Sequence, residues 1–178
     1  MLHSNLEKIK KLRIEIESLV KEVDKLKTQV SETKVSNIKV INSNITDLQQ
    51  KNQEIKIKTS ETLKLVDAVK VLNLEHGQKQ YISYANDFVK ETNKFVSILE
   101  KYTNALQKLP EIRHKLKELT NYISPSNNQA YTLCQEIHAL TQKSRHANKN
   151  WIPDFKKQSP ELLDALNTLL EICGYSRI

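Results

Sequence analysis

The first 76 residues repeat one pattern of apolar positions, with no glycine or proline before Gly77. Apolar residues recur in alternating steps of four and three, which is the 3.5-residue period of a coiled-coil seam. The pattern therefore predicts one long coiled-coil helix over residues 1–76. Its seam positions are Leu12, Ile16, Leu19, Val23, Leu26 and Val30, followed by Ile38, Ile41, Ile45, Leu48, Asn52, Ile55, Thr59, Thr62, Val66 and Val69.

Two features disturb this seam. Its two blocks differ in phase by one residue near 33–37, and such a skip either disturbs the supercoil or marks a bend. Asn52, Thr59 and Thr62 are polar residues that either select one register and partner or leave the seam imperfect. A single helix cannot bury its own seam, so it must pack against a later segment of this chain or against another chain. The predicted partner-binding positions are Leu12, Ile16, Leu19, Val23, Ile41, Ile45, Leu48 and Ile55.

Heptad spacing restarts after Gly77, a residue type common just past a helix end. It predicts a second amphipathic helix over residues 78–123, kinked or restarted at Pro110. If the two long helices pair within the chain, Gly77 lies at the hairpin tip; otherwise each pairs with a partner subunit. We interpret the aromatic positions as packing residues. The apolar face is Tyr81, Tyr84, Phe88, Phe95, Leu99, Tyr102, Leu106 and Leu109.

Residues 129–178 form a predicted small C-terminal helical head, which follows a loop at 124–128. The last helix has Ser159 as its N-cap, Pro160 at its first position and Gly174 after its end. The predicted fold class is all-α, with long coiled-coil helices and this small head. Composition agrees, because two glycines in 178 residues cannot supply the tight turns of a multi-stranded sheet.

Composition also limits the function classes. No apolar run approaches the roughly 20 residues that cross a bilayer, so no membrane partner is expected. The N-terminus lacks the apolar core of a signal peptide, and the two cysteines are expected to be reduced in the cytosol or nucleus. The sequence has no phosphate-binding loop, nucleophile elbow, zinc-protease motif or C-x-x-C pair. We therefore predict a protein that is not an enzyme, with no catalytic residue, cofactor, metal site or small-molecule substrate.

One basic stretch stands out in a chain whose formal net charge is +7. Basic residues mixed with aromatic ones can bind nucleic acid through phosphate contacts and stacking. Alternatively, Trp151 and Phe155 anchor this connector to the last helix, or Trp151 is a hot spot for a partner protein. The candidate nucleic-acid patch is Lys143, Arg145, Lys149, Lys156 and Lys157.

Asn150-Trp151 with Asp154, followed by a Leu-rich amphipathic helix and a Gly174-Tyr175 ending, resembles the centromere protein H family of inner-kinetochore subunits. The resemblance implies a nuclear, non-enzymatic subunit that links centromeric chromatin to the chromosome-segregation machinery. It also implies a hetero-oligomer with a centromere protein K-like coiled coil, close to DNA. The contact residues it implies are Trp151, Leu163, Leu166 and Leu170.

Two other assignments fit the same helical plan. A coiled-coil subunit of a dynactin-like or vesicle-tethering complex would be cytoplasmic. A nucleic-acid-binding accessory protein would use the basic stretch instead.

Overall fold

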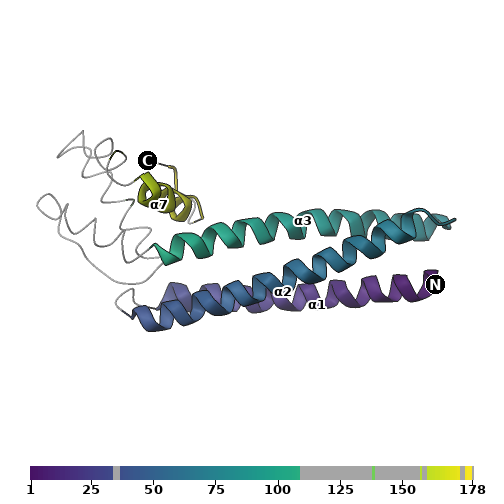
Figure 1. The fold of residues 1–178 in the computed structure, drawn as a ribbon, viewed down its shortest axis with the longest axis horizontal. Coiled ribbons are helices and arrows are strands. Elements are labelled where there is room, and N and C mark those ends of the chain that lie inside the picture. Colours follow the sequence, from purple (N-terminus) through teal and green to yellow (C-terminus); the bar gives the residue numbers. More distant parts are fainter. Residues whose placement is uncertain (34–36, 109–137, 139–156, 158–159, 173–174, 178) are drawn as a thin grey trace, which may run out of the picture. The chain divides into compact units, whose positions relative to one another are not determined.

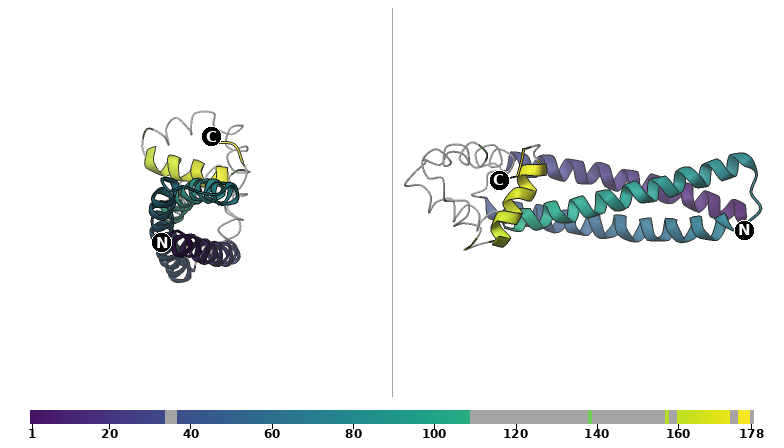
Figure 2. Two further views of the ribbon diagram at one scale, coloured as in Figure 1. Left: turned by 90° about the vertical axis from the view of Figure 1, so that its right-hand side faces the viewer. Right: turned by 90° about the horizontal axis from the view of Figure 1, so that it is seen from above.

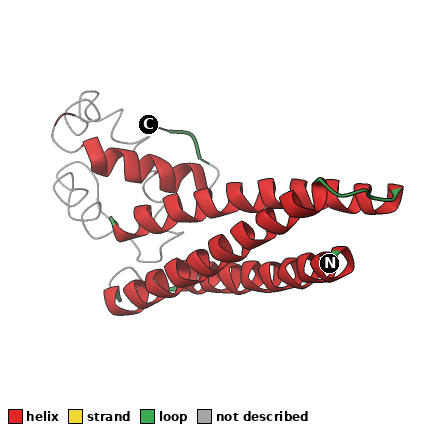
Figure 3. Ribbon diagram, turned by 45° about the vertical axis from the view of Figure 1, so that its right-hand side comes forward, coloured by secondary structure: helices red, strands yellow, loops and turns green. Residues whose placement is uncertain are grey.

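The computed structural model describes residues 1–33, 37–108, 138, 157, 160–172 and 175–177. The helices in this part of the chain are α1 (Leu2–Glu32), α2 (Ile38–Lys70), α3 (His76–Gln107) and α7 (Pro160–Ile172). Figure 3 shows helices and loops, and no strand, among the described residues. The predicted all-α fold class is confirmed.

The continuous helix predicted over residues 1–76 is wrong, because the structure has two helices there. The carbonyl oxygen of Asn37 accepts a hydrogen bond from the Ile41 N–H (3.2 Å), so Asn37 stands at the start of α2. Asn is a favoured N-cap residue, since its side chain can satisfy a first-turn N–H group. The phase shift near 33–37 therefore coincides with the interval between two helices.

The second break also lies earlier than predicted. α2 ends at Lys70, and α3 starts after Glu75. The Gln78 Oε1 accepts a hydrogen bond from the Glu75 N–H (3.0 Å), which is one half of a capping box. Gly77 thus lies in the first turn of α3 and not at the hairpin tip, and an added Cβ there would meet nothing within 4 Å. The local cap, rather than the glycine, marks this helix boundary.

α3 begins close to the predicted position and extends to Gln107. The rest of the predicted helix, including Pro110, lies outside the described residues. So does most of the predicted head, although α7 begins at Pro160 as expected from its N-terminal signals.

Contacts divide the chain into two compact units, each with residues from α1, α2 and α3. We call residues 1–25 and 48–100 the three-helix unit, and residues 26–47 and 101–178 the second unit.

Within the three-helix unit, α1 and α3 run in the same direction and α2 runs opposite to both (Figures 1 and 2). Two ion pairs show the antiparallel register of α1 and α2. The Lys58 Nζ lies 2.9 Å from the Glu15 Oε2, and the Lys51 Nζ lies 3.0 Å from the Glu22 Oε2. The core side chains of each helix are spaced by three and four residues. They are Ile9, Leu12, Ile16, Leu19 and Val23 of α1, Leu48, Ile55, Thr59, Thr62, Val66 and Val69 of α2, and Ile82, Ala85, Val89, Thr92, Val96 and Leu99 of α3.

One cluster ties the three helices together where α1 begins, α2 ends and α3 begins. Ile9, Val66, Val69, Leu74 and Ile82 are buried in it. Full burial of such side chains stabilises a fold by about 1.5–3 kcal/mol each, before the loss of chain entropy is counted. The seam that the sequence presents is thus buried by the chain's own helices.

The second unit has a core of its own. Tyr102, Leu106 and Leu170 are almost fully buried in it. The Lys27 ammonium lies 5.2 Å from the centre of the Tyr102 ring, a cation–π distance. α7 contributes Leu163 and Leu170, which are spaced by two helical turns and therefore lie on one face.

Candidate protein-docking surface

α3 has two apolar stripes on adjacent faces. The inner one, described above, is buried in the core of the three-helix unit. The other, which we call the outer stripe, consists of Tyr81, Tyr84, Phe88, Glu91, Phe95 and Ile98. Its members also alternate in steps of three and four, so it has the period of a second helix-packing seam.

The outer stripe is only partly covered by the chain. Tyr84 is 66% exposed and Ile98 is 56% exposed, whereas Phe88 and Phe95 are half-buried. The prediction that Tyr84 packs in the seam is therefore wrong. Over residues 81–95 the buried positions are neighbouring ones with smaller side chains, whereas Leu99, Tyr102 and Leu106 of the predicted apolar face are buried as predicted.

α1 contacts the outer stripe along one edge. The Arg13 guanidinium lies 6.0 Å from the Phe88 ring centre, and the Lys10 ammonium lies 5.7 Å from the Tyr81 ring centre. These are cation–π contacts, in which the ring face attracts the cation. Leu6 and Tyr81 pack on the same core cluster, and burial raises the pKa of the Tyr81 hydroxyl. The aromatic residues thus hold α1 and α3 in register.

A groove of about 360 Å³ opens between α1 and α3 beside the outer stripe. Ile16 and Val20 line it from α1, and Phe88, Thr92 and Phe95 line it from α3. Glu17, Lys21 and Glu91 also line it. An apolar groove between parallel helices, next to exposed apolar side chains, suits the docking of an amphipathic helix.

A second groove, of about 470 Å³, lies between α1 and α2. Leu12 and Leu65 line it together with the charged residues Lys8, Lys11, Glu15, Lys58, Glu61 and Lys64. The Lys58 ammonium donates a hydrogen bond to the Glu15 carboxylate at 2.9 Å. This bond lowers the pKa of Glu15 below its ordinary value of 4.5 and raises the pKa of Lys58. Two of the charged groups in this groove therefore neutralise each other.

Replacing Glu15 with glutamine is expected to lower the Tm slightly, by roughly 1–2 °C, because an ion pair at the surface that is still partly exposed to solvent contributes little. The pKa of Glu15 is lower in the folded chain, so its contribution is present above pH 4.5 and is lost as pH falls through the folded-state pKa. Thermal unfolding of wild type and Glu15→Gln should thus differ at pH 7 and converge at acidic pH. Glu61→Gln, in the same groove, is the control. A difference that persists in strong acid would contradict the ion pair.

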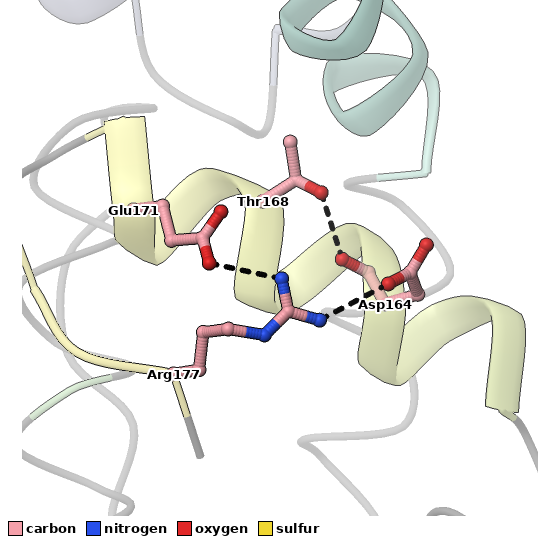
Figure 4. Close-up of polar contacts among 4 residues, drawn as sticks. All are labelled: Asp164, Thr168, Glu171 and Arg177. Carbon is pink, nitrogen blue, oxygen red and sulfur yellow. Dashed lines mark hydrogen bonds and ion pairs between the residues drawn. The ribbon is translucent and has the colours of Figure 1, made fainter.

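The end of the chain folds back along α7. The Arg177 guanidinium donates hydrogen bonds to Glu171 (2.9 Å) and Asp164 (3.3 Å), which lie on one face of α7 (Figure 4). The Tyr175 N–H donates to the Leu170 carbonyl at 2.8 Å, the spacing of a Schellman helix end. The Tyr175 ring stacks on His138 with centres 4.4 Å apart. These contacts attach the C-terminal residues to α7, and we assign them a structural role.

The structure places the predicted partner-binding residues of the long coil inside the chain. Their side chains are at most 9% exposed, so they are not presented to a partner. The physical reason is the pair of breaks near 33–37 and 71–75, which lets α1, α2 and α3 bury one another's seams. The residues concerned are Leu12, Ile16, Leu19, Val23, Ile41, Ile45, Leu48 and Ile55.

The predicted C-terminal site residues are described only in part. Leu163 and Leu170 are buried in the second unit, and Leu166 lies within α7. Lys157 is exposed. Trp151 and the other members of the predicted basic patch, Lys143, Arg145, Lys149 and Lys156, lie outside the described residues. The outer stripe was missed as a separate surface, although its 3–4 spacing was visible in the sequence.

Comparisons with known proteins leave the family open: no family model, curated protein or solved structure gives a significant match. None of the described helices combines the length and apolar character required to cross a membrane. Among the described residues, no group of three or more His, Cys, Asp and Glu side chains is placed to hold a metal ion.

Proposed function

We propose that this chain is a non-enzymatic structural subunit of a multiprotein assembly, which it joins through the outer stripe of α3 and the adjoining groove. The observation that supports this function is the exposure of Tyr84 and Ile98 on a stripe with the period of a helix-packing seam. Burying that stripe against another helix would remove apolar surface from water, which drives most protein association. The exposed Tyr84 and Ile98 and the half-buried Phe88 and Phe95 follow the spacing with which one helix packs against another, and this spacing supports the stripe as a docking surface.

In its narrower form, the proposal places the assembly at the inner kinetochore, where the chain would link centromeric chromatin to the chromosome-segregation machinery. The resemblance of the C-terminal region to the centromere protein H family supports this form. The partners would then include centromere protein I- and K-type subunits. Dynactin-like or vesicle-tethering complexes are the alternative assemblies.

The test is recovery of the tagged protein from its native cells at moderate salt, with identification of stoichiometric partners by mass spectrometry. We expect defined partners with wild type and at least roughly tenfold lower recovery with Tyr84→Glu/Ile98→Glu, which places two charges on the stripe. The matched control is Ile14→Glu/Ile57→Glu, because these side chains are 66% and 50% exposed but lie on α1 and α2.

The identity of the partners decides between the assemblies. Centromere protein I- and K-type subunits would support the kinetochore form, whereas motor or tethering subunits would overturn it and leave the structural role. Equal recovery by wild type and the stripe variant would contradict the stripe as the docking surface. Circular dichroism of each variant verifies that the helices are intact.

A further inference from the structure

We propose that the outer stripe of α3 pairs in the antiparallel direction with the outer stripe of a second copy of this chain. The inference rests on the proposed function, because it names a second copy of this chain as the subunit that occupies the docking surface, so that the chain would enter the assembly as a dimer. Three properties of the stripe support it: its period, the position of Glu91, and the charges of Asp87 and Lys94 beside it.

The period of the stripe permits it to pack against itself. Two seams with 3–4 spacing can interdigitate along their length, as in any two-stranded helical pair. Tyr84, next to the first residue of the stripe, and Ile98, its last residue, supply exposed apolar surface. The half-buried Phe88 and Phe95 and the exposed Glu91 lie between them. Phe88, Glu91 and Phe95 also line the groove along α1, which has room for side chains of a neighbouring helix.

Glu91 determines the direction of pairing. In a parallel, in-register pair each residue faces its own copy, so two Glu91 carboxylates would lie in the same layer and repel each other. In the antiparallel pair, Glu91 faces Phe88 of the second copy. The remaining layers then join Tyr84 to Phe95 and Tyr81 to Ile98, which are apolar on both sides.

Charged residues beside the stripe also favour antiparallel pairing. The antiparallel pair of α1 and α2 shows how such residues are placed. In that antiparallel pair, Glu15 precedes the seam residue Ile16, Lys58 precedes the seam residue Thr59, and the two charged groups form an ion pair of 2.9 Å. Residues that immediately precede seam positions of this type, which come four residues after one seam position and three before the next, thus face each other across an antiparallel helix pair.

Asp87 and Lys94 occupy the equivalent places in α3, before Phe88 and Phe95, and both are exposed. The same rule places Asp87 of one copy opposite Lys94 of the other. Because the pair has two-fold symmetry, this contact occurs twice. In the single chain, the Lys94 ammonium lies 3.2 Å from the Glu91 carboxylate, and both side chains are more than 70% exposed. Such an exposed ion pair is weak, so Lys94 can exchange Glu91 for Asp87 of the second copy.

The charges also select one register. Sliding the second helix by one heptad in one direction places Lys94 opposite Lys94, and sliding it in the other direction places Asp87 opposite Asp87. Both arrangements bring like charges together. The sequence of this short segment is therefore complementary to itself in a single antiparallel alignment.

The test measures the mass and the dissociation constant of the purified full chain by light scattering and sedimentation. We expect a concentration-dependent dimer for wild type. Asp87→Lys and Lys94→Asp each replace two attractive contacts by two repulsive ones, so each is expected to weaken the dimer at least roughly tenfold. Asp87→Lys/Lys94→Asp restores opposite charges in the same positions and is expected to restore the dimer to near wild-type affinity.

The matched control is Asp67→Lys, since Asp67 is an exposed acidic residue of α2 outside the stripe. It is expected to leave the dimer unchanged. A monomer at every concentration would overturn the inference, and so would a dimer that neither single substitution weakens. Failure of the double variant to restore the dimer would overturn the proposed alignment. Because this assay uses the purified chain alone, stripe-dependent recovery of cellular partners without self-association would overturn only the inference and leave the proposed function standing.

Discussion

Replacing Ile55 with aspartate is expected to unfold the three-helix unit. The Ile55 side chain is 0% exposed, so the new carboxylate would be removed from water among apolar side chains of the core. Truncating a buried isoleucine costs about 2–5 kcal/mol, and burying an unpaired charge adds to that cost. The total approaches the whole stability of an ordinary domain, which is about 5–15 kcal/mol. Urea unfolding followed by circular dichroism should show loss of helix or a greatly reduced midpoint.

Ile57→Asp provides the matched control for this experiment. Ile57 lies two positions along α2 but is 50% exposed, so its replacement introduces the same charge into solvent. We expect its unfolding midpoint to stay close to that of wild type. Similar unfolding curves for Ile55→Asp and Ile57→Asp would contradict the assignment of Ile55 to the core.

Replacing Asn52 with leucine is expected to stabilise the chain by about 1–2 kcal/mol, a rise in Tm of roughly 2–8 °C. The Asn52 side-chain nitrogen donates a hydrogen bond to the Val96 carbonyl at 3.3 Å, but its carbonyl oxygen is buried without a hydrogen-bond partner among the described residues. A buried, unsatisfied acceptor costs free energy that leucine would remove. Thermal unfolding measures the change.

The control for Asn52→Leu is Gln53→Leu, which changes a neighbouring exposed position of α2. It adds a similar apolar side chain to the surface and is expected to change Tm little. A lower Tm for Asn52→Leu than for wild type would indicate that the bond to Val96 contributes more than the buried oxygen costs. That result would favour Asn52 as a stabilising contact between α2 and α3.

These expectations separate two kinds of variant. Substitution of Ile55 or Ile16 changes the folded core, so any loss of partner binding would follow from unfolding. Substitution of Tyr84, Asp87 or Lys94 changes an exposed surface and reports on association directly. The sequence predicts the core seam as the partner surface, but the structure buries that seam within the chain, and we propose the outer stripe of α3 for the role instead.

Local signals in the sequence were sufficient for several elements. The scarcity of glycine and the 3–4 spacing of apolar residues predicted an all-α chain, and Pro160 predicted the start of α7. Two further local signals were present but not used. Asn37 is a favourable N-cap, and Gln78 supplies the capping contact that begins α3.

The outer stripe of α3 was harder to predict from the sequence than the helices were. The inner and outer stripes of α3 both follow the heptad spacing, so periodicity could not decide which one is buried. In the structure the inner stripe contains the small side chains Ala85 and Thr92, whereas the large rings of Phe88 and Phe95 lie at the edge beside α1. Small residues let helices approach closely, and this requirement depends on the neighbouring helices rather than on α3 alone.

By itself, the sequence determined that this protein is helical and that its helices need a partner along an apolar seam. The period of apolar residues encodes that need, because 3–4 spacing places them on one side of a helix. Only the tertiary structure decided that the partners are the chain's own helices, which meet after the breaks near 33–37 and 71–75. A seam buries its side chains equally well against its own chain or another. The choice therefore depends on where the chain turns back. The resulting arrangement covers the outer stripe of α3 only in part.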